Sequence, residues 1–369
     1  MKRLKAIEII KLLDQWASPY LIDKWDNTGF QIGDPKKEVS KILISLDLDR
    51  KVFTKAVNEN AQMIITHHPL IFKPLSKITK LSYKEKLIYD LIKEDIVVYN
   101  AHTNLDLAIG GVNDVLANIL GIKNTKPIKT IYEESLFKLV VFVPRDYAHS
   151  IRKVLGEAGA GWIGNYSHCT YNIEGTGTFM PLEGTNPFIG EAYVMEEVEE
   201  TRIETIVEEK SINHVIEEMI KHHPYEEVAY DIYPLKNKGR TYGYGRVGEV
   251  KEISLLNFLN IIKEALKIEN VIVYGDQNKT VRKVAVCGGS GSSFIYDAYA
   301  KEADIFITGD VKYHDAQYAN ELGLILIDAG HYHTEKVILP VIKEYLEDNI
   351  VDKPEIIVYG ESSPPYVVY

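Results

Sequence analysis

Five side chains of the kinds that bind metal ions are grouped in three short segments of this 369-residue chain. They are His67, His68, Asp106, His331 and Glu335. Three imidazoles and two carboxylates, with no thiolate, suit Zn, Fe, Mn or another first-row divalent ion better than a structural zinc finger. Five ligands for two ions would leave open coordination positions, as catalytic metal sites require.

The spacing of these residues indicates how they can meet. Adjacent residues of an extended chain point in opposite directions, so His67 and His68 can address two metal ions, or one ion and a neighbour. His331 and Glu335 are four residues apart at the apparent start of a helix, which puts both on one face. Asp106 follows a predicted strand, in an expected loop, and a carboxylate there can bridge two cations. A single histidine of this kind is more often a surface or core residue, but three clusters favour a metal site. We therefore expect two divalent metal ions per chain, zinc first and iron or manganese as alternatives.

Each metal-binding motif, and several other polar motifs, directly follows a short run of β-branched and apolar residues. These runs are Lys41–Leu46, Met63–Ile65, Ile96–Tyr99, Val284–Val286, Ile305–Ile307 and Leu324–Ile327. Such runs are typical of strands buried on both faces of a sheet. Helical patterns between them, for example at Tyr83–Lys93 and Phe294–Ala303, predict an α/β core sheet with helices on its faces. Ligands bind beyond the carboxyl ends of strands in such sheets, and the polar motifs lie there.

Three further residues are candidates for catalysis. Asp310 and His314 are four residues apart after another predicted strand, and they can support the metal ligands or transfer protons. His102, followed by Thr103, can do the same. We take His102, His314 and Asp310 as catalytic candidates. Surface polar residues at the start of a helix remain the alternative.

Two other motifs leave alternatives open. The segment Gly288–Ser293 (GGSGSS) lies between a predicted strand and helix, where backbone N–H groups can hold an anion. A tight turn explains the same glycines equally well. Trp25, Asn27 and Gln31 can line a cavity, although Trp25 is equally plausible in the core.

The middle of the chain has a different pattern. Residues 131–238 lack the repeated strand-then-polar-motif design and predict a β-α-β-β-α-β ferredoxin-like unit. The expected strands at its ends are Lys138–Val143 and Val228–Tyr233, and the expected helices are Tyr147–Ala158 and Ser211–His222. The simplest organisation is one discontinuous core domain, with halves at 1–130 and 239–369, interrupted by this inserted α+β domain.

Composition and charge limit which binding partners and which cellular location we expect. The net charge is −11, from 42 Lys and Arg against 53 Asp and Glu, which argues against a nucleic-acid backbone as the main partner. Cys169 and Cys287 are far apart, and we expect free thiols in a reducing cytoplasm. Residues 1–16 form an amphipathic pattern without a signal-peptide core. Since no apolar run reaches the roughly 18 residues of a membrane span, we expect a cytoplasmic protein without a membrane partner.

Six motifs taken together resemble the Nif-three-like family. They are WDNTGFQIGD (Trp25–Asp34), ITHHPLIF (Ile65–Phe72), NAHTNLD (Asn100–Asp106), GGSGSS (Gly288–Ser293), ITGDVKYHDA (Ile307–Ala316) and DAGHYHTE (Asp328–Glu335). The resemblance covers both flanking segments in order. Bacterial members are often labelled GTP cyclohydrolase I type 2 homologs or dinuclear metal centre proteins. The resemblance implies that the five residues listed first above are the metal ligands.

The insert also carries a resemblance. The segment HPYEEVAYDIYPL (His223–Leu235) is similar to the PII- and CutA-like domain of longer family members. PII-like modules are associated with trimers and with sensing of small ligands. Family members tend to form hexameric toroids whose metal sites face an internal cavity. The resemblance therefore implies a homohexamer with trimeric contacts made by the insert.

These features support two main functional hypotheses. Two neighbouring divalent ions lower the pKa of a bridging water and hold a substrate oxygen, which suits hydrolysis of a phosphoester, an amide or a purine ring. The first hypothesis is a metal-dependent hydrolase acting on a nucleotide or related small molecule; the family label suggests ring opening of GTP, with His102 or His314 as acid–base group. The alternative is a non-enzymatic, ring-forming regulatory or metal-handling protein with a ligand-sensing insert. Binding of DNA by a toroid is weakened by the negative charge.

Overall fold

The structure is a computed structural model that describes residues 4–360 and 364–366. The chain divides into two compact units. The first, here called the core unit, contains Met1–Tyr132 and Tyr242–Tyr369, and the second, called the insert, contains Glu133–Thr241. Among the described residues, no helix combines the length and apolar character needed to cross a membrane.

The first sheet of the core unit has five strands in the order β1-β4-β3-β2-β17. They are β1 (Gly29–Ile32), β2 (Lys41–Ser45), β3 (Met63–Thr66), β4 (Val97–Asn100) and β17 (Glu355–Val358). Strands β17, β2, β3 and β4 pair in parallel, and β1 is an edge strand that pairs antiparallel with β4. Its helices are α1 (Ala6–Trp16), α2 (Arg50–Asn58), α3 (Tyr83–Lys93) and α12 (Leu339–Asn349).

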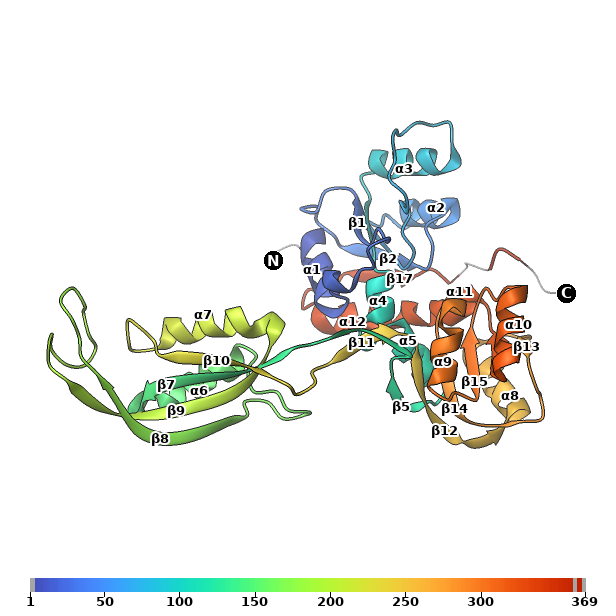
Figure 1. The fold of residues 1–369 in the computed structure, drawn as a ribbon. Helices are drawn as coiled ribbons and strands as arrows, with labels where there is room; N and C mark the ends of the chain where they lie inside the picture. The colour runs from blue at the N-terminus through green and yellow to red at the C-terminus, as the bar shows by residue number, and fades with distance from the viewer. Residues whose placement is uncertain (1–3, 361–363, 367–369) are drawn as a thin grey trace. The chain divides into compact units, whose positions relative to one another are not determined.

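The apolar runs are buried on both faces of this sheet, as the sequence predicts. In β2, Ile42 and Ile44 pack into one hydrophobic cluster with residues of α1 and α12. Leu43, between them, packs into a second cluster with residues of α2 and α3. Successive strand residues point to opposite faces, so a continuous apolar run is needed where helices cover both. Figure 1 shows α2 and α3 on one side of the strands and α1 and α12 on the other.

The second sheet of the core unit has six strands in the order β13-β16-β15-β14-β12-β5. They are β5 (Lys123–Lys126), β12 (Arg246–Ser254), β13 (Ile272–Tyr274), β14 (Thr280–Val286), β15 (Ile305–Thr308) and β16 (Ile325–Asp328). The central three, β14, β15 and β16, pair in parallel. The core unit therefore contains two sheets, and the prediction of a single core sheet was wrong. The periodicity of a segment shows which of its residues are buried, but it does not show which strands pair.

The remaining helices of the core unit connect or cover the two sheets. They are α4 (Thr103–Leu107), α5 (Val112–Ile119), α8 (Leu255–Leu266), α9 (Ile295–Ala300), α10 (Tyr313–Leu322) and α11 (His331–Glu335), with 3-10 turns η1 (Pro19–Leu21), η4 (Ser292–Phe294) and η5 (Lys336–Ile338). Local signals explain several boundaries. The Ser254 hydroxyl caps α8 by accepting from the Asn257 N–H, and Gly323 ends α10 in the left-handed conformation.

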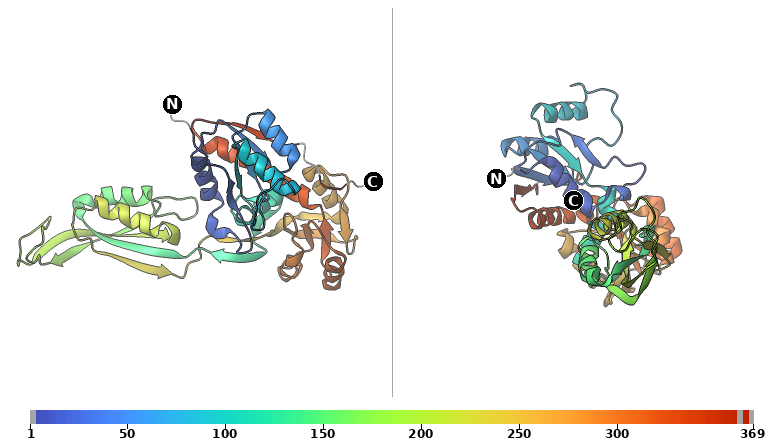
Figure 2. Two further views of the ribbon diagram at one scale, coloured as in Figure 1. Left: turned by 90° about the horizontal axis from the view of Figure 1, so that it is seen from above. Right: turned by 90° about the vertical axis from the view of Figure 1, so that its left-hand side faces the viewer.

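The insert has the element order β-α-β-β-α-β that the sequence predicts. Its elements are β7 (Leu136–Pro144), η2 (Arg145–Tyr147), α6 (Ala148–Glu157), β8 (Thr170–Phe179), β9 (Glu196–Glu208), η3 (Glu209–Ser211), α7 (Ile212–His222) and β10 (Tyr230–Leu235). The strands form an antiparallel sheet in the order β10-β7-β9-β8. Helices α6 and α7 pack side by side and share one hydrophobic cluster with β7 and β9 (Figure 2). The chain enters and leaves the insert through a paired two-stranded ribbon, β6 (Lys129–Glu133) and β11 (Thr241–Tyr244).

Candidate metal centre

Six side chains of the core unit come together beyond the carboxyl ends of strands in both of its sheets. Their ligand atoms form three overlapping groups, within each of which the atoms lie within 4.8 Å of one another. The groups are His67, His68 and His102; His68, His331 and Glu335; and His67, Asp106 and Glu335. All five residues predicted as metal ligands are therefore brought together, and His102 joins them. Such groups can bind a metal ion.

His67 and His68 directly follow β3 and are held in different ways. His67 is fully buried, and its Nδ1 lies 2.8 Å from the carbonyl oxygen of Ala101. The Nδ1 of His68 lies 2.8 Å from Oδ1 of Asp47. Each ring therefore keeps its Nε2 for the cluster. The two rings share one group with His102, and each also belongs to a separate group that contains Glu335. This division between two groups is what adjacent residues on an extended chain allow.

Helix α11 supplies a histidine and the shared carboxylate. His331 Nε2 and His68 Nε2 lie 3.0 and 2.9 Å from Oε2 of Glu335. On the other side, Oε1 of Glu335 lies 3.8 Å from Nε2 of His67. A Cβ on Gly289 would lie 2.1 Å from that Oε1, so the second glycine of the GGSGSS segment is required by close approach to the carboxylate.

Asp106 occupies a different place from the one expected. It lies within the short helix α4 rather than in a loop, and its Oδ1 is 3.6 Å from Nε2 of His67. Asp106 belongs to one of the groups, whereas Glu335 belongs to two. Glu335, and not Asp106, is therefore the carboxylate that two of the groups share. The helical turn was not recognised because α4 has only five residues and lacks a side-chain cap.

His102 is oriented by a carboxylate that sequence reasoning did not single out. Its Nδ1 lies 3.0 Å from Oδ1 of Asp26, whose other oxygen accepts hydrogen bonds from the hydroxyls of Thr28 and Thr103. Burial acts to raise the pKa of Asp26, but the bonds from His102, Thr28 and Thr103 outweigh it and lower that pKa. Asp26 is therefore a carboxylate that holds His102 with Nε2 free.

The four imidazoles share one design. Each Nδ1 contacts an oxygen acceptor, which is a backbone carbonyl for His67 and a carboxylate for the other three rings. Such outer contacts fix the tautomer and orientation of metal-binding histidines and increase their basicity. For His331 the acceptor is Asp310, with Oδ2 2.6 Å from Nδ1. The sequence gives only weak signals that Asp47 and Asp26 hold the histidines. Asp47 directly follows an apolar run, and Asp26 lies inside the WDNTG motif.

Two buried polar atoms of the cluster have no hydrogen-bond partner among the described residues. They are His67 Nε2 and Asp106 Oδ1, whereas Oε2 of Glu335 lies within 3.0 Å of two imidazole nitrogens. Leaving such an atom unsatisfied costs about 1–3 kcal/mol, and more when it is charged. A divalent cation would satisfy this nitrogen and this carboxylate oxygen at once. The donor set present therefore fits a bound metal ion.

Opposite charges in the cluster shift several pKa values. Burial alone would lower the pKa of His68 and His331, but Glu335 together with Asp47 or Asp310 raises the two values to about 10 and about 9. Burial would raise the pKa of Glu335, yet the surrounding imidazoles hold it well below its usual range. Without metal, protonated imidazoles therefore neutralise the buried carboxylate, and a metal cation would take over that role.

These pKa directions predict how metal binding depends on pH. A metal ion binds only neutral imidazole, and both His68 and His331 carry their protons well above pH 7 in the metal-free site. We therefore expect binding at pH 7 to release at least about two protons per chain, and the affinity to rise with pH up to about 10. Calorimetric titration in buffers of different ionisation enthalpy measures the protons released. Release of no protons, or an affinity independent of pH between 6 and 9, would contradict this expectation.

The cluster opens onto a cavity of about 570 Å³. Its walls include His102, His331 and Glu335 and the aromatic side chains of Trp25 and Phe294. Phe294 stacks on Tyr244 with ring centroids 4.7 Å apart, and Trp25 is 60 % exposed. A site with metal-binding groups on one wall and aromatic faces on others suits a small molecule that contains a planar ring.

The GGSGSS segment contributes to the cavity wall as a turn. The N–H groups of Gly288, Gly289 and Gly291 donate to side-chain oxygens of the core unit. These three donors are therefore engaged, which favours the tight-turn interpretation over an anion cradle built from them. Gly288, Ser290 and Ser293 line the cavity.

The other predicted residues divide between the cluster and its surroundings. Asp310 contacts His331 and so acts through a ligand residue. His314 lies in α10, where its ring packs 5.3 Å from that of Tyr313 and its Nδ1 lies 3.4 Å from Gln317. It belongs to none of the three groups.

The motif around Trp25 also holds the chain next to the histidine pair. Asn27 donates from Nδ2 to the carbonyl oxygen of Ile71, and Oε1 of Gln31 accepts the N–H of Ile71 at 2.7 Å. Trp25 lines the cavity, which is one of the two alternatives for this residue, whereas Asn27 and Gln31 fix the loop that follows His68.

Replacing Asp47 with asparagine should weaken metal binding. The amide would no longer present a carboxylate to Nδ1 of His68, and loss of such an outer contact lowers metal affinity about 10–100-fold. Competition with a chromophoric chelator measures this change. Asp34→Asn is the matched control, because Asp34 is exposed and the amide oxygen can still accept its bond from the Lys36 N–H. Equal affinity of the Asp47 variant and the control would exclude a supporting role for Asp47.

Comparison with known proteins agrees with the fold and identifies the family. The family model described as Duf34/NIF3 (NGG1p interacting factor 3) matches residues 4–365. A protein of Halalkalibacterium halodurans named GTP cyclohydrolase 1 type 2 homolog is 43% identical over 354 residues, which are 96% of this chain and 95% of the relative. A Bacillus subtilis protein of the same name is 42% identical over 353 residues, covering 95% and 94% of the two chains. The crystal structure of a Bacillus cereus protein related to NIF3 superposes with a TM-score of 0.92 at 43% identity and covers 100% of both chains. This chain therefore belongs to the Duf34/NIF3 family.

Proposed function

We propose that the core unit binds two divalent metal ions and uses them to hydrolyse a nucleotide or a related small molecule. One ion would be held by His67, Asp106 and Glu335, and the other by His68, His331 and Glu335. The observation that carries this proposal is the shared Glu335 carboxylate between two groups of ligand atoms at the wall of a cavity. Zinc fits the donor set first, with iron and manganese as alternatives.

The chemistry follows from the kind of site. Two bound divalent ions would activate a water molecule and polarise a substrate oxygen. The chain itself would hold the substrate, because Trp25, Tyr244 and Phe294 offer ring faces on which a planar base can stack. The name shared by the bacterial relatives points to GTP as the first substrate to test.

His102 is the acid–base group of this proposal. It lines the cavity, and Asp26 holds its Nδ1, so Nε2 can exchange a proton with substrate or water. Asp310 acts as a positioning residue for His331. A catalytic role of His314 stays a prediction from the sequence.

A screen of nucleotides, beginning with GTP, and of phosphoesters with the zinc-, iron- and manganese-loaded protein tests the proposal. We expect one substrate class to be hydrolysed, and His102→Asn to lose about 100-fold in kcat, as general acid–base groups contribute. Asparagine can still donate to Asp26, so the variant keeps the local contact. Elemental analysis must show that the variant retains its metal. Full turnover by a metal-loaded variant would exclude His102, and no turnover with any loaded form would exclude the hydrolase function.

The alternative proposal is a non-enzymatic, ring-forming regulatory or metal-handling protein in which the insert senses a ligand. It is favoured by the separate hydrophobic cluster of the insert, which makes the insert a unit that can respond to a ligand by itself. In this proposal the insert is PII/CutA-like and makes trimeric contacts within a cytoplasmic homohexamer. Native mass spectrometry distinguishes the assemblies: six chains agree with this proposal, and a monomer contradicts it.

A further inference from the structure

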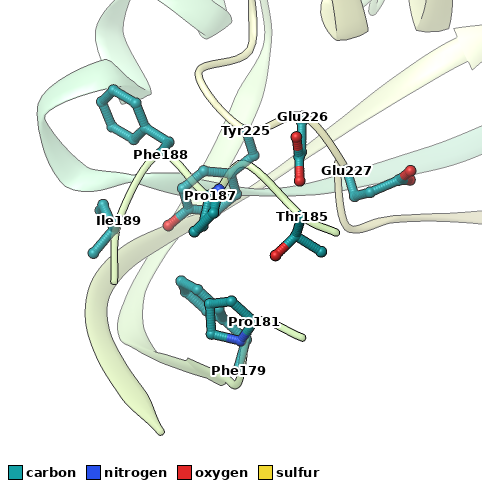
Figure 3. Close-up of a pocket in the computed structure, with 9 residues that line it drawn as sticks. All are labelled: Phe179, Pro181, Thr185, Pro187, Phe188, Ile189, Tyr225, Glu226 and Glu227. Atoms are coloured by element: carbon teal, nitrogen blue, oxygen red, sulfur yellow. The ribbon is translucent and has the colours of Figure 1, made fainter. Parts of the chain in front are cut away.

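The insert contains a pocket of its own, outside the metal centre. It has a volume of about 210 Å³ and is formed by the end of β8, the segment from Pro181 to Ile189 and the turn after α7. Figure 3 shows Phe179 and Pro181 on one side of the pocket, with Pro187 and Tyr225 across from them. The volume is below the roughly 300–1,000 Å³ of clefts for drug-sized ligands, so the pocket suits a group of few atoms.

Aromatic rings dominate the pocket and are inclined to one another. The centroid of Tyr225 lies 6.0 Å from that of Phe179 and 6.3 Å from that of Phe188, with interplanar angles of 61° and 52°. Tyr147 packs edge-on against the outer side of this group, 5.6 Å from Phe188. The rings therefore pack on one another at inclined angles, so that both ring faces and ring edges are available where these residues line the pocket.

The charged residues that line the pocket are all acidic. They are Glu226 and Glu227, and the other seven lining residues are uncharged (Figure 3). Oε1 of Glu226 accepts the backbone N–H of Asn186 at 3.0 Å, which ties the segment that covers the pocket to the turn after α7. An anion would be repelled here, and a neutral apolar guest would gain nothing from the two carboxylates.

A third carboxylate acts on the central ring. The Tyr225 hydroxyl donates to Oε1 of Glu200 at 3.0 Å. Burial and then this carboxylate raise the pKa of Tyr225, so the phenol keeps its proton. Donation to an anion increases the electron density of the ring, which strengthens the attraction of its face for a cation.

We propose that this pocket binds a small organic cation of the quaternary ammonium class. The ammonium group would lie against Phe179, Phe188 and Tyr225, and Glu226 and Glu227 would supply the opposite charge. Aromatic faces attract such cations because the charge is spread over alkyl groups and is weakly hydrated. A bare metal ion would instead need several oxygen or nitrogen ligands at short distance, which inclined phenyl rings do not provide.

The probe for this proposal is choline, compared with 3,3-dimethylbutan-1-ol, a neutral molecule of the same shape. Titration of the full chain, followed by NMR or calorimetry, should give choline binding at least about tenfold tighter than binding of the alcohol. Glycine betaine, whose carboxylate would face the acidic residues, should bind more weakly than choline. Equal binding of choline and the alcohol, or no binding of choline at millimolar concentration, would overturn the proposal.

Matched variants place the binding in this pocket. Phe188→Leu removes a half-exposed ring, and Glu226→Gln removes a charge while keeping an oxygen for the Asn186 N–H. Each should weaken choline binding about tenfold. Tyr171→Leu on β8 and Glu217→Gln on α7 are the controls, because both residues are exposed in the insert and lie outside the pocket lining. Unchanged binding in both pocket variants, with unfolding temperatures equal to that of the controls, would also overturn the proposal.

Discussion

Changing Glu335 to glutamine is expected to remove both of the proposed metal ions rather than one. Glu335 is the carboxylate shared by two groups of ligand atoms, with His67 on one side and His68 and His331 on the other. Glutamine keeps the size but loses the negative charge, and its NH₂ cannot act as a ligand. Loss of a supporting contact already costs about 10–100-fold in metal affinity, so loss of a shared ligand should cost at least about 100-fold for each ion.

Asp106→Asn is the comparison that makes this prediction specific. Asp106 belongs only to the group with His67 and Glu335, so its loss should weaken one ion and leave the other nearly unchanged. Elemental analysis after dialysis against a weak chelator measures both variants beside the wild type. If Glu335→Gln retains one full equivalent, or if Asp106→Asn loses as much metal as Glu335→Gln, Glu335 does not bridge two sites.

Removal of the metal should lower the unfolding temperature of the core unit. A ligand present at 100 times its dissociation constant stabilises the folded state by about 2.7 kcal/mol. For a unit of this size that corresponds to about 5–10 °C in the melting temperature. The physical reason is that a metal ion would satisfy His67 Nε2 and Asp106 Oδ1, which otherwise lie buried without hydrogen-bond partners among the described residues. Calorimetry with and without a chelator measures the shift.

The insert provides an internal control for this effect. It has its own hydrophobic cluster, built from residues such as Val141, Ile151 and Met219, and contributes none of the metal-binding groups. Hydrogen exchange of peptides from residues 133–241 should therefore stay unchanged when metal is removed, while exchange near β3 and α11 should increase. An equal increase in both units, or no change in melting temperature on full metal removal, would contradict a metal site confined to the core unit.

The sequence predicts the buried strands of the core well, but not how they pair. Runs such as Lys41–Leu46 become strands because helices cover both faces of the sheet, so every position must be apolar. Strand order depends on contacts between distant segments, for example the parallel pairing of β17 with β2, whose partners Ile356 and Ile42 are far apart in the chain. Local periodicity carries no information about such pairs, and so one core sheet was expected where there are two.

The candidate metal ligands could be predicted from the sequence because the signals that mark them are local. His67 and His68 directly follow a strand, and His331 and Glu335 mark the ends of one helical turn, so their types and spacing are local signals. Asp106 lies inside the short helix α4, a few residues after its strand. The carboxylates that orient the histidines were not accessible, because Asp26 reaches His102 across 76 positions of the chain. The contact of Asp310 with His331 agrees with the supporting role that the sequence offers for Asp310, but it does not arise from the spacing of Asp310 and His314. Asp310 lies before α10 with a φ of 56°, where the helical i, i+4 rule does not apply, and it turns to His331 instead.

Anomalous X-ray diffraction from crystals of the metal-loaded protein, recorded above and below the absorption edge of the bound metal, tests the dinuclear centre most directly. We expect two peaks in the anomalous map for each chain. One should be contacted by His67, Asp106 and Glu335, and the other by His68, His331 and Glu335. A single peak, or peaks that Glu335 does not contact, would contradict the proposal of two metal ions that share this carboxylate.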